Sequence, residues 1–173
     1  MTPELRKSEL RKIDGDPLHY TACGLDDVYL VNGFTRETVD GEEFITIENI
    51  DGLWKAIGLH LVDTRRKVLA PKEIRFLREH MDLTQAELGA KLRVTDQTVA
   101  RWEKGETDMP GSADLVLRIL FLACPCAQPE GNKILEKVSK VLDETVTQDE
   151  STSRPVVFSH GKRKWREERQ LAV

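Results

Sequence analysis

The spacing of apolar residues divides the chain into an N-terminal stretch of strands followed by a run of helices. Tyr, Val and Leu gather around Val28–Val31, which predicts a strand that ends at the strong turn signal Asn32-Gly33. Thr35–Val39 could continue the strand pairing, and Asp40-Gly41 marks a second turn. Polar and apolar residues then alternate through Glu43–Ile47, which indicates another strand.

A helix is expected directly after these strands. Asn49 or Asp51 is the expected N-cap, because a short polar side chain can accept a hydrogen bond from a free amide at the helix start. The apolar residues of this helix recur at intervals of three and four and therefore share one face: Ile50, Leu53, Trp54, Ile57 and Leu61. Strands and helix together predict a small α+β unit.

From Pro71 onward the pattern is that of short amphipathic helices. Pro71 suits the first helical position, and a second helix begins after Thr84, which forms a capping box with Glu87. Thr95 caps a third helix, which ends at Gly105. Three short, closely spaced helices of this kind predict a helical bundle.

The remaining elements are two further helices and a terminal hairpin. The fourth helix opens at Ser112 or Asp114, and residues 130–143 are expected to form another amphipathic helix. Val156-Val157-Phe158, together with Trp165, predict a final strand or hairpin that docks back onto the fold.

Composition narrows the class of protein. The chain has 173 residues, of which 39% are hydrophobic and 32% charged, as in an ordinary globular protein. Its 3 Cys are an odd number and too few for a disulfide scaffold, which favours a reducing compartment. The N-terminal residues contain no apolar signal segment, and the longest apolar stretch, Leu115–Ala127, is interrupted by Arg118 and Pro125. We therefore expect a cytoplasmic protein that does not enter a membrane.

The formal net charge of -4 hides a local pattern. Residues 1–64 hold 6 Lys or Arg against 13 Asp or Glu, whereas residues 65–104 hold 10 against 6. Residues 105–173 are nearly balanced, with 10 against 11. The central basic block indicates either a segment that faces an anionic partner or a solvated basic face.

The most informative segment is Gln85–Gly105, in which a short turn joins two capped helices. Gly89 is small where the helices must cross. The remaining inward positions are apolar: Leu88, Leu92, Val94, Val99 and Trp102. This pattern is typical of a helix-turn-helix, whose second helix enters the major groove of DNA.

Residues 83–105, LTQAELGAKLRVTDQTVARWEKG, resemble the XRE (Cro/repressor-type) helix-turn-helix. With its flanking helices, the resemblance covers residues 70–123. Arg93 stands where this family usually has Gly, in the turn between the helices. If the left-handed backbone is kept there, Arg costs on the order of 1 kcal/mol relative to Gly, a strain that a contact with a phosphate could offset.

The sequence ahead of the motif, with HYTACGLDDVYLVNGF and GLWKAIGLHLV, is similar to the MqsA-like antitoxin group. Many members of that group carry an N-terminal zinc finger with paired CxxC motifs. This chain lacks the finger, because Cys23 stands alone and Cys124 and Cys126 follow the motif. The resemblance implies an antitoxin-like autoregulator without a zinc finger.

The XRE resemblance also implies roles for polar residues of the motif. Base reading falls to the second helix, where Gln97 would pair with adenine and Arg101 with guanine or a phosphate. Thr98 would touch a thymine methyl group, while Asp96 would either accept from cytosine or stabilise the helix start. Contacts with phosphates are implied for Thr84, Gln85, Lys91, Arg93, Thr95 and Lys104. The alternative for all of these residues is a solvated polar face.

Two further groups of cations allow either reading. Arg75 and Arg78 are expected to contact phosphates or to be solvated charges. The basic segment Lys162–Arg166 is either a second nucleic-acid contact, with Trp165 available for stacking, or a solvated tail that Trp165 anchors.

Other chemistry is weakly represented in the sequence. Cys124 and Cys126 could be half of a metal site, but a second pair of ligands is missing at the usual short spacing. Cys23 has no basic neighbour and is expected to be a buried, unreactive thiol. No phosphate-binding, nucleophile or metalloprotease motif is present in the sequence. We expect no enzyme, no metal and no cofactor.

The predicted fold class is mainly α with a small N-terminal α+β unit and a helix-turn-helix bundle of four to five helices. Five segments follow along the chain: a flexible arm (1–17), the α+β unit that could hold a dimer or bind a partner (18–64), the XRE-type domain (65–124), a C-terminal amphipathic helix (125–145) and a linker with a basic tail and a docking strand (146–173).

These observations predict a sequence-specific DNA-binding repressor that binds double-stranded DNA as a homodimer. Dimerisation is expected because one recognition helix reads too few bases, and the N-terminal unit, the C-terminal helix or both could hold the dimer. Within this class, an antitoxin-like autoregulator with a toxin partner comes before a stand-alone regulator that senses a ligand or a protein. A protein-interaction module that does not bind DNA is the alternative from another class.

Overall fold

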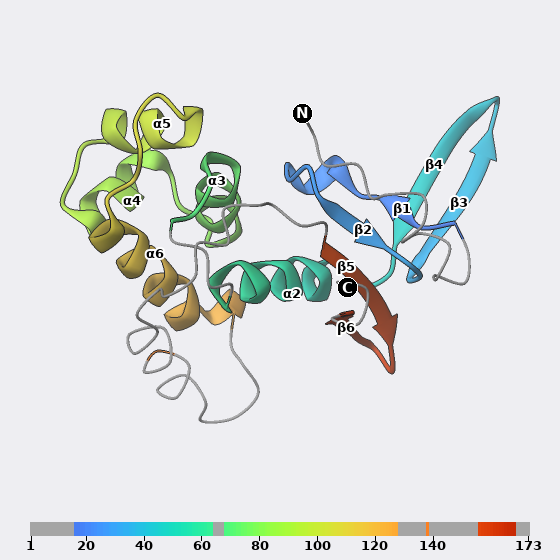
Figure 1. The fold of residues 1–173 in the computed structure, drawn as a ribbon. Coiled ribbons are helices and arrows are strands. Elements are labelled where there is room, and N and C mark those ends of the chain that lie inside the picture. Colours follow the sequence, from blue (N-terminus) through green and yellow to red (C-terminus); the bar gives the residue numbers. More distant parts are fainter. Residues whose placement is uncertain (1–15, 64–67, 128–137, 139–155, 169–173) are drawn as a thin grey trace. The chain divides into compact units, whose positions relative to one another are not determined.

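The computed structural model describes residues 16–63, 68–127, 138 and 156–168 (Figure 1). These residues divide into two compact units. The described residues up to Ala56 join those from Val156 onward in the first unit, and the second begins at Ile57. The boundary between the units therefore falls inside one helix, α2 (Ile50–Asp63).

The first unit is built on a four-stranded sheet in the order β1-β2-β5-β6. The four strands are β1 (Leu18–His19), β2 (Val28–Leu30), β5 (Val156–Gly161) and β6 (Lys164–Glu167). A short 3-10 turn, η1 (Thr21–Cys23), follows β1. Strand β2 pairs antiparallel with β1 and parallel with β5, and all of its residues are buried. The predicted strand at Val28–Val31 and the predicted C-terminal hairpin are confirmed, and the hairpin docks through pairing of β5 with β2.

Trp165 anchors the C-terminal hairpin in this unit. Its side chain is 7% exposed, and its indole N–H donates to the carbonyl oxygens of Glu48 at 2.9 Å and Asn49 at 3.2 Å. The ring lies against Gly33, whose φ of +75° and lack of Cβ leave room for it. Trp165 is therefore a packing residue and is not available to stack on a base.

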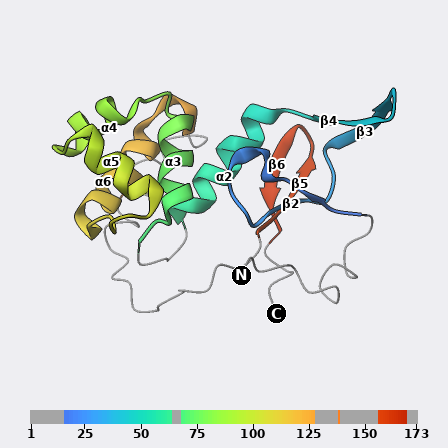
Figure 2. The same ribbon diagram turned by 90° about the horizontal axis from the view of Figure 1, so that it is seen from above.

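A separate two-stranded ribbon joins β2 to α2. It consists of β3 (Phe34–Val39) and β4 (Glu42–Ile47), which pair only with each other. Figure 1 and Figure 2 show the ribbon extending away from the four-stranded sheet. Both faces are exposed, and Val39, Phe44 and Ile45 are 52%, 51% and 42% exposed. Thr35–Val39 therefore does not continue the pairing of β2, because the chain turns at Gly33 and forms a second sheet.

Helix α2 starts as its sequence predicts, because the Asn49 side chain accepts a hydrogen bond from the Gly52 amide at 3.2 Å. Its second half belongs to the helical unit, although the sequence assigns the whole helix to the N-terminal one. The reason is packing: the Phe121 ring lies where a Cβ on Gly58 would be. Near the helix end, the buried Arg118 donates to the carbonyl oxygen of Leu61 at 2.8 Å.

The second unit adds helices α3 (Pro71–His80), α4 (Gln85–Leu92), α5 (Asp96–Lys104) and α6 (Gly111–Ala123), followed by the 3-10 turn η2 (Pro125–Ala127). The starts of α3, α4 and α5 are those that the sequence predicts. Neither Ser112 nor Asp114 opens α6, because Pro110 is its N-cap and the helix begins at Gly111. Asp114 is instead buried, where it accepts from the Leu69 amide at 2.7 Å and pairs with Arg118 at 2.8 Å.

The fold class is α+β with a helix-turn-helix bundle. "Mainly α" describes it too narrowly, since the described residues form two sheets beside five α-helices. Apart from residue 138, the helix predicted over 130–143 lies outside the described residues, as do the arm up to residue 15 and the linker. Within the described part of the chain, no helix is both long and apolar enough to traverse a bilayer.

Candidate nucleic-acid interface

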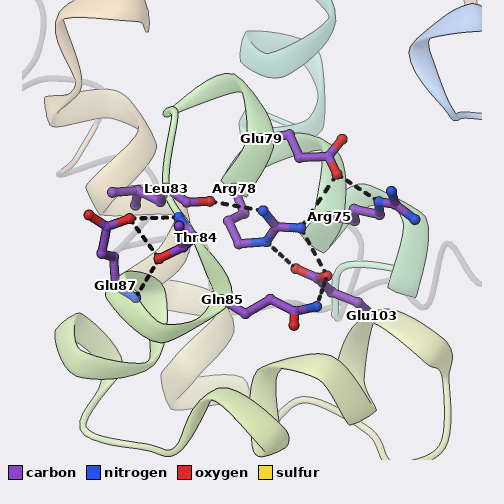
Figure 3. A network of polar contacts seen from close by, with 8 residues as sticks. All are labelled: Arg75, Arg78, Glu79, Leu83, Thr84, Gln85, Glu87 and Glu103. Atoms are coloured by element: carbon purple, nitrogen blue, oxygen red, sulfur yellow. Dashed lines mark hydrogen bonds and ion pairs between the residues drawn. The ribbon is translucent and has the colours of Figure 1, made fainter.

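Thr84 organises the start of α4. Its hydroxyl oxygen accepts a hydrogen bond from the Glu87 amide at 3.2 Å, and a Glu87 carboxylate oxygen accepts from both the Thr84 amide and the Thr84 hydroxyl at 2.7 Å (Figure 3). These bonds to the ionised form lower the pKa of Glu87. The single hydroxyl hydrogen of Thr84 is therefore engaged within the helix, and the exposed Thr84 acts here as a cap.

A buried ion pair holds α3, α4 and α5 together (Figure 3). Arg78 donates through Nε and Nη2 to the two carboxylate oxygens of Glu103, at 2.6 and 3.1 Å, and through Nη1 to the carbonyl oxygen of Leu83 at 2.8 Å. The Arg78 and Glu103 side chains are only 11% and 4% exposed. The bonds to Glu103 raise the pKa of Arg78, so its charge is permanent. Arg78 is therefore neither a phosphate contact nor a solvated charge.

Gln85 joins this network at the start of α4. Its side-chain amide donates to a Glu103 carboxylate oxygen at 2.9 Å, which braces Gln85 against α5, the next helix. Sequence reasoning missed Glu103, although a signal was present: it lies four positions after the buried Val99, on the inward face of α5. Arg75, on the exposed side of α3, pairs with Glu79 at 2.8 Å.

The turn between α4 and α5 has the predicted left-handed residue. Arg93 has φ 60° and ψ 36°, its amide donates to the carbonyl oxygen of Ala90, and the next amide, of Val94, donates to that of Gly89 at 2.9 Å. This is the pattern of a Schellman motif, in which Gly is the preferred left-handed residue. A Cβ on Gly89 would lie 2.8 Å from the carbonyl oxygen of Val94, which confirms the close crossing of the helices.

Helix α5 buries one face and exposes the other. Val99 and Trp102 are 0% and 3% exposed, as predicted for the core face. Asp96, Gln97 and Arg101 are exposed on the opposite side. Gln97 and Arg101 are one turn apart, so the structure brings them to the same face of the helix.

Hydrogen bonds at the start of α5 engage part of its polar residues. The Thr95 hydroxyl accepts from the Thr98 amide at 3.2 Å and lies 2.9 Å from the Thr98 hydroxyl. Asp96 accepts from the Gln97 amide at 2.8 Å, which is a contact with the helix start. The half-buried Thr98 thus uses its hydroxyl locally, whereas the Gln97 side chain stays exposed.

Cations surround this exposed helix face. Lys91 in the last turn of α4, Arg93 in the turn and Lys104 at the end of α5 are all exposed. Arg101 and Lys104 lie 3.7 and 3.9 Å from the carboxylate of Glu106, a residue that the sequence pattern did not mark as part of the site. Such long, exposed ion pairs are worth little, so an anionic ligand could displace Glu106.

The cysteines and the potential metal ligands of the described residues were the other candidates in the sequence. No cluster of three or more His, Cys, Asp or Glu suitable for a metal ion occurs among the described residues. Cys124 and Cys126 are joined as a disulfide. Burial raises the pKa of the Cys23 thiol, which donates to the carbonyl oxygen of Tyr20 at 3.2 Å, so this thiol is a poor nucleophile.

Comparison with known proteins agrees with this geometry over part of the chain. Residues 74–117, about a quarter of the chain, match a family model described as Helix-turn-helix. Neither a curated protein nor a solved structure matches the chain. The match supports an XRE-type helix-turn-helix, which is a DNA-binding type of motif, in the region from α3 to α6. Similarity to the MqsA-like group stays a prediction.

Proposed function

We propose that the chain is a transcriptional repressor that recognises a specific DNA sequence by inserting α5 into the major groove. The observation that carries the proposal is the form of α5 itself: one face is buried on the other helices, and the opposite face presents Gln97 and Arg101 to solvent. A capped, firmly packed helix with an exposed polar face is what base readout requires. The helix-turn-helix match over residues 74–117 supports the same conclusion.

Each residue of the exposed face has a role suited to its chemistry. Gln97 pairs in a bidentate manner with adenine, and Arg101 leaves Glu106 to bind guanine or a phosphate. Thr98 offers its methyl group to thymine, because its hydroxyl is used by Thr95. Asp96 primarily stabilises the helix start, with an acceptor oxygen for cytosine as the alternative.

Phosphates are bound at the margins of the motif. The cations Lys91, Arg93 and Lys104 supply charge, and the helix starts at Gln85 and Thr95 supply amide hydrogens. The bonds of the Thr84 hydroxyl to Glu87 support an indirect role for Thr84, which positions the amides of α4. The buried Arg78 and Glu103 pair is a positioning element, because it sets α5 relative to α3, and Gln85 at the start of α4 joins the same carboxylate.

The repressor acts as a homodimer on a palindromic operator. One recognition helix contacts too few base pairs for a specific site, and two-fold symmetry doubles the number. Either the N-terminal unit or the helix predicted over residues 130–143, or both, hold the dimer. The oligomeric state is measured by sedimentation velocity on the full chain.

Within this function, an antitoxin-like autoregulator that also binds a toxin is favoured by the β3–β4 ribbon. An isolated two-stranded ribbon is marginally stable in water, and this one exposes Val39, Phe44 and Ile45. Residues 34–51 carry 6 Asp or Glu against 1 Arg, so a second copy of the ribbon would be repelled. The charge fits a basic protein, which would cover the apolar side chains.

DNA binding is tested by fluorescence anisotropy with the chain's own upstream DNA and a scrambled duplex at about 50 and 200 mM salt. We expect tight binding to the upstream duplex, weakened steeply by salt. The double variant Gln97→Ala/Arg101→Ala should lose the preference while keeping its fold, whereas Arg75→Ala, which removes the same charge outside α5, should keep it. A double variant that still discriminates would refute the role of α5.

The alternatives are separated by the same measurement. Equal, weak binding to both duplexes would indicate an operator elsewhere, as expected for a stand-alone regulator that senses a ligand or a protein. No binding at either salt concentration would favour a protein-interaction module that does not bind DNA. The toxin partner is tested by co-purification with the product of the neighbouring gene, for wild type and for the charge-reversed ribbon variant Glu42→Lys/Glu43→Lys.

A further inference from the structure

Positive φ angles at non-glycine residues fall into two groups in the described part of the chain. Three of these residues are Asp or Asn, which tolerate the left-handed conformation best: Asp40, Asn49 and Asp82. The other three are cations, for which the conformation is costly: Arg93, Lys162 and Arg163. One of the cations, Arg93, already lies in the helix-turn-helix, which raises the question of what the other two do.

Lys162 and Arg163 form the two-residue turn of the β5–β6 hairpin. Their φ angles are 49° and 68°, and the turn is closed by pairing of Gly161 with Lys164. Two consecutive positive φ angles define the type I′ class of hairpin turns, in which Asn-Gly or Asp-Gly is strongly preferred. Lys and Arg are therefore unfavourable choices for the stability of this hairpin.

The other hairpin of the same unit shows the favourable choice. Asp40 and Gly41 connect β3 to β4 with φ angles of 53° and 86°, the same turn class. One unit thus contains two turns of one class, one with preferred residues and one with two adjacent cations. Strain of this kind in a folded protein is commonly associated with a functional site.

The strained turn is also a concentration of positive charge. Lys162, Arg163, Lys164 and Arg166 are all exposed, whereas residues 16–56 hold 9 Asp or Glu against 2 Lys or Arg. The turn is held in place, because the buried Trp165 anchors β6 and the Asn49 side chain donates to the Arg163 carbonyl oxygen at 3.2 Å. A rigid cationic tip on an otherwise acidic unit points to an anionic ligand.

We propose that the β5–β6 turn is a second DNA contact, in which Lys162 and Arg163 bind backbone phosphates of the duplex that α5 reads. This inference rests on the proposed DNA-binding function. DNA is favoured over other polyanions because the same chain contains the proposed duplex-binding helix-turn-helix, and a second contact made by the same chain adds to the affinity for the duplex when both can engage it. Phosphate contacts need charge and position but no base sequence, which fits a two-residue turn of Lys and Arg.

Two variants separate charge from strain. Lys162→Asn/Arg163→Gly installs the preferred turn residues, and Lys162→Gln/Arg163→Gln removes the charges but keeps the strain. We expect both variants to make the fall of log K with log salt less steep. The steepness should decrease by about 0.9 for each phosphate that is no longer bound, so by about 1.8. Only the Asn-Gly variant should also melt several degrees higher, because only this variant relieves the left-handed strain.

The measurement is anisotropy with the upstream duplex between about 50 and 200 mM salt, alongside calorimetric melting of each full-length variant. The control Arg36→Gln/Lys55→Gln removes two charges from the same unit and should keep the wild-type slope. An unchanged slope in both turn variants, with wild type binding normally, would overturn this inference and leave the DNA-binding function standing. An equal decrease in the steepness of the salt dependence in the control variant would also overturn the inference, because it would show an effect of net charge alone. Failure of wild type to bind any duplex would refute the proposed function itself.

Discussion

Replacing Arg93 by Gly tests whether the turn of the helix-turn-helix is strained. Arg93 holds φ 60° and ψ 36°, a conformation in which the Cβ of an L-residue crowds the backbone. Relief of this crowding is worth roughly 1–2 kcal/mol, from which about 0.4–1 kcal/mol is lost because Gly makes the unfolded chain more flexible. The net gain in the free energy of unfolding is then about 0.5–1 kcal/mol.

Differential scanning calorimetry of the full chain measures this gain. For a domain of this size a gain of about 0.5–1 kcal/mol raises the melting temperature by roughly 2–8 °C. Arg93→Ala is the matched control, because it removes the same charge but keeps a Cβ in the left-handed conformation. We expect the alanine variant to melt close to wild type.

The same two variants report on DNA. If Arg93 binds a phosphate, the glycine and alanine variants should each show a less steep fall of log K with log salt, by about 0.9. Only the glycine variant should also melt at a higher temperature. A glycine variant with an unchanged or lower melting temperature would refute the strain argument. A glycine variant that gains no more than the alanine variant would refute it equally, because the gain would then come from removal of the charge.

Three further predictions concern other contacts of the structure. Glu103→Ala removes the two short bonds of the Arg78 guanidinium and leaves it only the longer carboxylate contact with Glu79 at 3.4 Å, so a loss of about 3 kcal/mol is expected in urea unfolding; a loss below about 1 kcal/mol would contradict the buried pair. Gly33→Ala should cost at least about 2 kcal/mol in the same assay, because the new Cβ meets the ring of Trp165 and the residue keeps φ +75°; a neutral result would contradict this packing. The lowered pKa of Glu87 stabilises the fold above the ordinary pKa of Glu, and this contribution is lost as the pH falls through the lowered value. Melting temperatures from about pH 6 down to about pH 3 should therefore fall less steeply for Glu87→Gln than for wild type, and parallel curves would argue against the capping contact.

The local parts of the site could be predicted because neighbouring residues determine them. Thr84 and Thr95 begin their helices, and Gly105 ends α5, through contacts within a few positions of each residue. The left-handed turn at Arg93 follows from the same short-range geometry. The exposed face with Gln97 follows from the 3.6-residue period of a helix whose apolar side is evident from sequence.

Hydrogen bonds and ion pairs between side chains that lie far apart in the sequence could not be predicted in the same way. Arg78 looks like any surface cation in the sequence, and only the packing of α3 against α5 brings it to Glu103, which lies 25 positions away. Asp114 looks like a helix start, but it is buried against the Leu69 amide, 45 positions away.

The sequence by itself therefore determines the short helices and turns of this protein, because caps, turns and apolar stripes act over one or two helical turns. Folding of the whole chain was needed to pair Leu30 with Phe158, far along the chain, and so to bring the β5–β6 turn into the N-terminal unit. It was also needed to divide α2 between two units. The sequence shows that an apolar strand must pair with another strand and that a buried charge must pair with an opposite charge. Which strand or side chain it pairs with is determined only by the packing of the whole core.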